Sequence, residues 1–148
     1  IRLDASNGNK QFQQASSDNV PRFNSLRAGP NGDFFYTGND DNVIKKRDSS
    51  DASIIWTSKI DSSGERIPLE EIIVGPKNDY VYARKQKIQL ARGFSKPTIR
   101  KIIIEDGSKV WDKEIGGRDI EISPGGSFFY AANRNGRLGK YNAHVNED

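Results

Sequence analysis

The sequence predicts an all-β fold made of antiparallel four-stranded units, two of them complete and a third incomplete. One segment occurs three times along the chain, at residues 29–36, 75–82 and 123–130. Each copy is a Pro-centred turn followed by an aromatic run that ends on Tyr. Pro fixes φ at the second turn position, and aromatic residues favour a half-buried strand. No segment of about ten residues or more has the 3.6-residue apolar spacing of a long helix.

The three copies recur at a spacing of roughly 40–50 residues, which is typical of β-propeller blades. Such a blade is a meander of four short antiparallel strands. The first expected blade covers about residues 22–60. Its strands are expected at 22–28, 33–37, 43–47 and 53–60. Polar stretches at 38–42 and 48–51 separate the later strands and are typical of hairpin loops.

The second expected blade covers about residues 68–115 and is longer than the first. Its strands are expected at 69–74, 79–83, 99–104 and 109–115. The last two are joined by Glu105–Ser108, in which Asp-Gly between apolar runs is a strong hairpin signal. Residues 85–97 are additional to the blade, and we interpret them as a longer excursion or an extra hairpin arm.

The third expected blade begins at about residue 118 and ends near 143 without a fourth, Trp-bearing strand. Its strands are expected at 119–122, 128–132 and 137–141. The polar segment 1–21 is interpreted either as a flexible leader or as the source of a closing strand at Lys10–Ala15. Such a strand would complete a blade of the same chain or of a neighbouring one.

Two stretches resemble a known family. Ile44–Trp56 and Arg100–Trp111, which reads RKIIIEDGSKVW, resemble the quinoprotein-type (PQQ-like) propeller repeat. Ser123–Tyr130 resembles the equivalent turn in YVTN and WD-type propeller repeats. The resemblance covers about residues 22–142 and implies a β-propeller. The chain departs from the family at Asp51-Ala52, where the hairpin usually has Gly, and its single Trp-Asp dipeptide is Trp111-Asp112.

A partial propeller needs a partner. Propellers typically close with four to eight blades, more than this chain supplies. Only 34% of its residues are hydrophobic and the mean hydropathy is −0.77, which also indicates a sparse core. We therefore expect protein partners, either the rest of a parent chain or other subunits, in preference to an array of blades that stays open. The chain begins at Ile1 and contains no Met, so we interpret it as a processed or excised piece of a longer protein.

The sequence lacks the residue patterns of common active sites. There is no Cys, and the single His is His144, close to the end of the chain. Nucleophile elbows, phosphate-binding loops and zinc-binding helices are missing from the sequence. Acidic pairs such as Asp40-Asp41 lie where Asp and Asn are good turn formers. We therefore predict no enzyme activity, no cofactor, no catalytic residue and no metal site.

A cluster of basic residues within 82–101 is the candidate binding site. It contains no acidic residue and consists of Arg84, Lys85, Lys87, Arg92, Phe94, Lys96, Arg100 and Lys101. A basic arm with an aromatic residue suits an anionic glycan or another polyanion. The alternative is a solvated strand edge whose cations prevent aggregation. The net charge of only +3 argues against nucleic acid, and no apolar run approaches the roughly 18 residues of a membrane span.

Together these observations predict a non-catalytic, propeller-type scaffold or interaction module within a larger protein or a multi-subunit assembly. A virion or cell-surface component is one setting of this kind. One alternative is recognition of a glycan or other polyanion through loop tips and the basic arm 84–101. The least favoured alternative is a fragment of a quinoprotein-like enzyme. A Cys-free sequence does not fix the compartment and is compatible with cytoplasmic, extracellular and virion settings.

Overall fold

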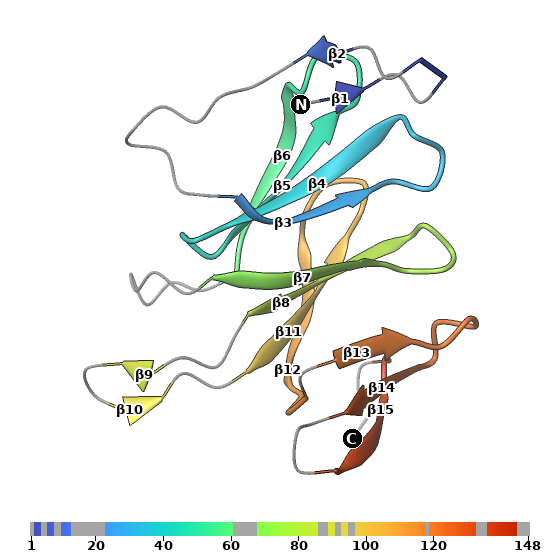
Figure 1. Cartoon of the computed structure of the whole chain (residues 1–148). Helices are drawn as coiled ribbons and strands as arrows, with labels where there is room; N and C mark the ends of the chain where they lie inside the picture. Colours follow the sequence, from blue (N-terminus) through green and yellow to red (C-terminus); the bar gives the residue numbers. More distant parts are fainter. Residues whose placement is uncertain are drawn as a thin grey trace.

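The computed structural model describes residues 2–3, 6–7, 10–12, 23–60, 68–85, 89–90, 93–94, 97–117, 119–132 and 136–144. These residues form strands, turns and bends and contain no helix, which confirms the predicted all-β class. Three antiparallel sheets of four, four and three strands lie one above another (Figure 1). None of the three sheets closes on itself.

Each sheet is a meander in which strands that are consecutive within the sheet pair with one another. The first sheet consists of β3 (Phe23–Ala28), β4 (Phe34–Asn39), β5 (Val43–Asp48) and β6 (Ile54–Lys59). The second consists of β7 (Leu69–Val74), β8 (Tyr80–Lys85), β11 (Thr98–Ile103) and β12 (Lys109–Glu114). The third consists of β13 (Asp119–Ile122), β14 (Phe128–Ala132) and β15 (Leu138–Asn142). These bounds lie within about two residues of the predicted ones.

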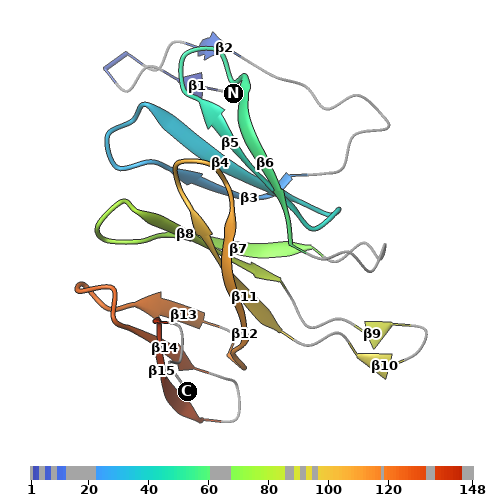
Figure 2. The ribbon, with the colours of Figure 1, turned by 180° about the vertical axis from the view of Figure 1, so that it is seen from behind.

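Two small hairpins accompany the three sheets. β1 (Arg2–Leu3) pairs with β2 (Lys10–Phe12), and β9 (Gln89–Leu90) pairs with β10 (Gly93–Phe94). The β9–β10 hairpin projects away from the second sheet (Figures 1 and 2), where the sequence suggested an extra arm. The described strands of the N-terminal segment pair with each other and not with the third sheet.

The three Pro-centred turns have the same backbone geometry. In each, the first residue donates its N–H to the carbonyl at the start of the following strand, at 2.8 Å in all three: Gly29 to Phe34, Gly75 to Tyr80 and Ser123 to Phe128. The fourth turn residue has positive φ in each case, at Gly32, Asn78 and Gly126. All three turns lie on the same side of the stack (Figure 1).

Strand alternation directs successive aromatic residues to opposite faces of each sheet. Tyr82 packs toward the third sheet, whereas its neighbour Val81 packs toward the first. The result is two cores, one on each side of the second sheet. The first contains Tyr36, Ile44, Trp56, Ile60, Leu69, Ile72, Val81, Ala83, Ile102 and Ile104. The second contains Ile73, Tyr82, Ile99, Trp111, Ile115, Ile120, Phe129, Ala131 and Ala143.

Trp56 joins the first two sheets. Its indole Nε1 donates a 2.9 Å hydrogen bond to the carbonyl of Ile104, at the turn between β11 and β12. Gly107 in that turn has a φ of 77° and lies against the indole ring, where a Cβ would come within 2.8 Å of ring carbons. The corresponding hairpin of the first sheet has Ala52 at a φ of 65°. An alanine therefore adopts the left-handed conformation at the position where the propeller repeats that this sequence resembles usually have Gly.

We predict that Gly107→Ala destabilises the protein more than Gly32→Ala. Both residues have a φ of 77°, but a Cβ at Gly32 meets no atom within 4 Å. The control should therefore lose only the left-handed backbone term, about 1–2 kcal/mol. Gly107→Ala adds overpacking against Trp56, for a total of about 2–5 kcal/mol. Urea unfolding measures both values, and equal losses would contradict the packing of this turn on Trp56.

Candidate interaction surfaces

The predicted basic arm is only partly brought together. Arg84 and Lys85 end β8, and Arg100 and Lys101 lie on the adjacent β11. Phe94 lies in β10, and Lys87, Arg92 and Lys96 lie outside the described residues. Because neighbouring residues of a strand point to opposite faces, Arg84 and Lys101 are directed toward the third sheet, whereas Arg100 is directed toward the first.

Arg84 is buried and its charge is compensated by two glutamates. Its guanidinium lies 2.7 Å from a carboxylate oxygen of Glu70 and 3.0 Å from one of Glu71. It also donates a hydrogen bond of 3.3 Å to the carbonyl of Gly117, at the entrance to the third sheet. Both glutamates belong to β7, which pairs with β8. Arg84 therefore connects strands and sheets inside the molecule.

A cavity of about 190 Å³ lies beside this cluster, between the first strands of the three sheets. Its lining includes Glu70, Glu71 and Glu121 together with residues of β3. Burial raises the pKa of Glu71, and the nearby Glu121 and Glu70 add to the increase, whereas Arg84 opposes it. The cavity therefore combines three glutamates with Arg27 in its lining and with Arg84 beside it.

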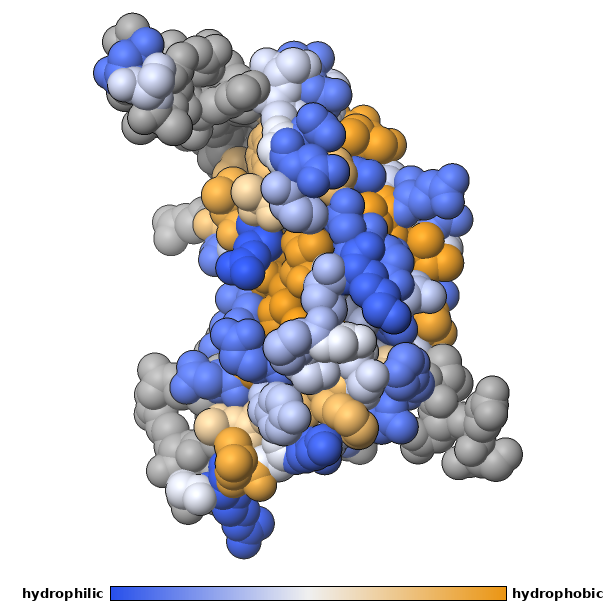
Figure 3. Space-filling model, turned by 90° about the vertical axis from the view of Figure 1, so that its right-hand side faces the viewer, coloured by the Kyte–Doolittle hydropathy of each residue, from blue (hydrophilic) through white to orange (hydrophobic). Residues whose placement is uncertain are grey.

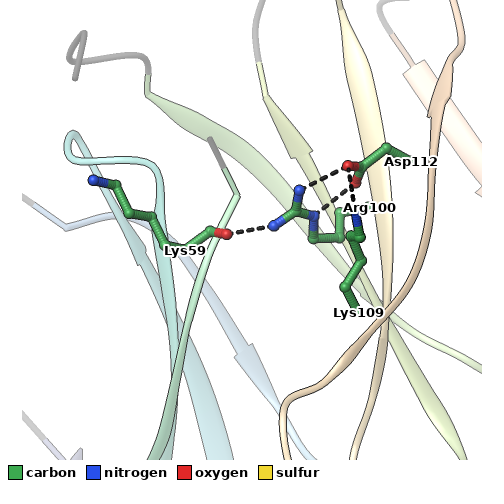
Figure 4. Close-up of polar contacts among 4 residues, drawn as sticks. All are labelled: Lys59, Arg100, Lys109 and Asp112. Carbon is green, nitrogen blue, oxygen red and sulfur yellow. Dashed lines mark hydrogen bonds and ion pairs between the residues drawn. The ribbon is translucent and has the colours of Figure 1, made fainter. Parts of the chain in front are cut away.

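Arg100 is paired across the sheet with Asp112 (Figure 4). Two guanidinium nitrogens contact the two carboxylate oxygens of Asp112, at 2.6 and 2.7 Å. A third nitrogen donates to the carbonyl of Lys59 in the first sheet, and Lys109 lies 3.6 Å from the same carboxylate. Such bidentate geometry holds the guanidinium in a fixed orientation.

Lys101 belongs to a series of lysine–aromatic contacts that the sequence reasoning missed. Its Nζ lies 3.7 Å from the centre of the Tyr80 ring. The corresponding pairs are Lys46 over Phe34 in the first sheet, at 4.2 Å, and Lys140 over Phe128 in the third, at 3.9 Å. Lys46 and Lys101 are buried, whereas Lys140 is exposed. No signal in the sequence indicated these pairs. Their equivalence appears only in the structure, where the third residue after each lysine donates its backbone N–H to the residue before the aromatic strand.

Large exposed hydrophobic residues gather on the first and third sheets. Among the described residues they are Phe23, Leu26, Ile54, Ile55, Tyr130 and Leu138. None of them belongs to the second sheet, which is covered on both faces. Seen from the side that carries the Pro-centred turns, hydrophobic atoms form several patches between hydrophilic ones (Figure 3). Sequence reasoning did not single out these residues, since it could not tell which sheets lie at the ends of the stack.

The remaining candidates carry no recognisable chemistry. His144 lines a cavity of about 210 Å³ together with Tyr80, Tyr82 and Lys101. Within the described ranges, no group of three His, Cys, Asp or Glu side chains is placed to hold a metal ion. In the same part of the chain, no helix is long and apolar enough to cross a membrane.

Comparison with known proteins gives no match: neither a family model nor a curated protein corresponds to this chain.

We predict that the stability contributed by Lys101 depends on pH. Burial lowers its pKa below the ordinary value of 10.5, with Lys113 adding to the decrease and Asp79 opposing it. Just below 10.5 the unfolded chain therefore binds this proton more readily than the folded one, so the contribution rises with increasing pH. The wild type should gain stability relative to Lys101→Met as the pH rises from neutral toward the ordinary value of 10.5.

The measurement is urea unfolding of both proteins across this range. Burial also raises the pKa values of Tyr36 and Tyr82, but both tyrosines are present in both proteins, so their effect cancels in the comparison. Lys140→Met is the matched control, because it removes the corresponding but exposed lysine–aromatic contact. A constant difference between wild type and Lys101→Met would show that Lys101 is not buried as a charged group.

Proposed function

We propose that this chain is a non-catalytic, propeller-type scaffold that acts by packing its end sheets against further protein, within a larger polypeptide or a multi-subunit assembly. One observation carries the proposal. Every large exposed hydrophobic residue of the described part belongs to the first or third sheet, and the second sheet has a core on each face. Apolar side chains exposed in this way are typical of interaction sites.

The polar residues support a structural role. Arg84 and Arg100 are held by Glu70, Glu71 and Asp112. Lys46 donates to the carbonyl of Ile104 across the interface between the first two sheets. These groups are directed at neighbouring strands and sheets. An active site instead needs polar groups that converge on a space where a substrate can bind.

The proposal predicts protein contacts at both end sheets in the cells that produce the protein. A photo-crosslinking amino acid at Leu26 or Tyr130 should give covalent products with protein, because both side chains are exposed on end sheets. The same probe at Asn31 or Lys77, exposed in Pro-centred turns, is the matched control. Products at the turns and none at the end sheets would contradict the proposal.

The alternative of polyanion recognition has a separate test. The test replaces Lys85 and Lys87 of the basic arm and leaves Arg84 and Arg100, which hold the sheets together, in place. We expect Lys85→Gln with Lys87→Gln to lower the salt concentration for heparin elution only as much as Lys45→Gln with Lys77→Gln, a pair outside the arm. A clearly larger decrease for the arm pair would favour a polyanion-binding arm.

A further inference from the structure

The outer face of the third sheet has the side chains that the other two sheets use for stacking. This tail face consists of Phe128, Tyr130, Leu138 and Lys140, which alternation and strand pairing place on one side. Tyr130 follows its turn as Tyr36 and Tyr82 follow theirs. Those two tyrosines are 0% and 2% exposed, because the next sheet covers them, whereas Tyr130 is 41% exposed. In the described part of the chain, the tail face therefore differs from the equivalent faces of the other two sheets in having no sheet packed on it.

The outer face of the first sheet is equivalent to the faces of the second and third sheets that cover the preceding sheet. This head face consists of Phe23, Leu26, Phe35 and Ile54. Leu26 pairs with Thr37 as Ile72 pairs with Ala83 and Ile120 with Ala131. Ile72 and Ile120 are 4% and 2% exposed because each covers the preceding sheet, whereas Leu26 is 70% exposed.

From these two faces we propose that the tail face of one copy of this chain packs on the head face of a second copy. The inference rests on the proposed function and names the partner. The contact would continue an arrangement that the chain already makes twice, between its first and second and its second and third sheets. Both halves of a third such contact are present on every chain, at opposite ends of the stack (Figure 1).

The internal contact also predicts a specific hydrogen bond. Lys46 Nζ donates to the carbonyl of Ile104 at 3.1 Å. Lys140 in the third sheet is equivalent to Lys46 in the first. Ser49 is equivalent to Ile104, because the backbone N–H of each donates to the carbonyl of the residue that precedes the aromatic strand of its sheet. In the proposed contact, Lys140 donates to the carbonyl of Ser49 of the second copy.

The head face also carries charged side chains, since the register places Lys45 and Arg47 opposite Thr37 and Phe35. Arg47 lies within the first sheet, where its guanidinium donates to Thr37 Oγ1 and to the carbonyl of Ala52 and stacks on Phe23. Two copies that each use both faces bring six sheets together. That number lies within the range of about four to eight at which propellers close, and the contact is head-to-tail.

The test uses one charged substitution on each face. Leu26→Glu blocks the head face and Tyr130→Glu blocks the tail face, both at exposed positions. In analytical ultracentrifugation at high micromolar concentration, we expect the wild type to exceed the monomer mass and each variant alone to be a monomer. An equimolar mixture of the two variants should form a heterodimer, because one intact head and one intact tail remain. Asn31→Glu, in an exposed turn, should assemble like the wild type.

A monomeric wild type would overturn the proposal, as would variants that assemble normally or a mixture that fails to associate. Circular dichroism checks that each variant is folded, and the milder Leu26→Ser and Tyr130→Ser pair replaces any variant that is not. Failure here is distinct from failure of the proposed function. Crosslinks from Leu26 and Tyr130 to another polypeptide, with a monomeric purified chain, would retain the scaffold role and exclude the second copy as its partner.

Discussion

The structure depends on one constraint: the second sheet has apolar side chains on both faces, and each of these faces is covered by a neighbouring sheet. Tyr82 and Val81 are neighbours on β8, yet they belong to different cores. The second sheet therefore packs against both of the others, and each end sheet contributes one face to a core. With 34% hydrophobic residues, the chain has little apolar material beyond these two interfaces. The favourable free energy of burying apolar surface, about 25 cal/mol per Å², must therefore come mainly from the packing of the sheets on one another.

The two internal interfaces are not equivalent. At the first, Trp56 Nε1 and Lys46 Nζ both donate to the carbonyl of Ile104. At the second, Trp111 Nε1 is buried without a hydrogen-bond partner, and Lys113 instead reaches the carbonyls of Asn142 and His144, at 2.8 and 2.7 Å. An unpaired buried donor costs about 1–3 kcal/mol. The first core has an unpaired buried group as well, the Tyr36 hydroxyl, so the two interfaces differ in which side chains form the hydrogen bonds between sheets.

Local signals were enough to predict the strands, and non-local ones were needed for the candidate sites. The Pro-centred turns and the aromatic runs are encoded by adjacent residues, so strands such as Leu69–Val74 and Phe128–Ala132 were predicted with their observed bounds. The basic arm was identified from a segment free of acidic residues. Its acidic partners come from β7 and β12, which lie beside β8 and β11 only in the folded sheet. Register, rather than composition, decides which charges remain available.

The exposure of equivalent aromatic residues depends on their position in the stack. A residue such as Tyr130 has the same sequence context as Tyr36 and Tyr82, so its exposure reflects position in the stack and not a change in chemistry. The exposed Lys140 over Phe128 reproduces a contact that is buried at Lys46 and Lys101. Burying a lysine costs free energy unless its ammonium group is compensated. Lys140 incurs no such cost while it is exposed, and its ammonium group would need a partner such as the Ser49 carbonyl only in the proposed contact between two copies.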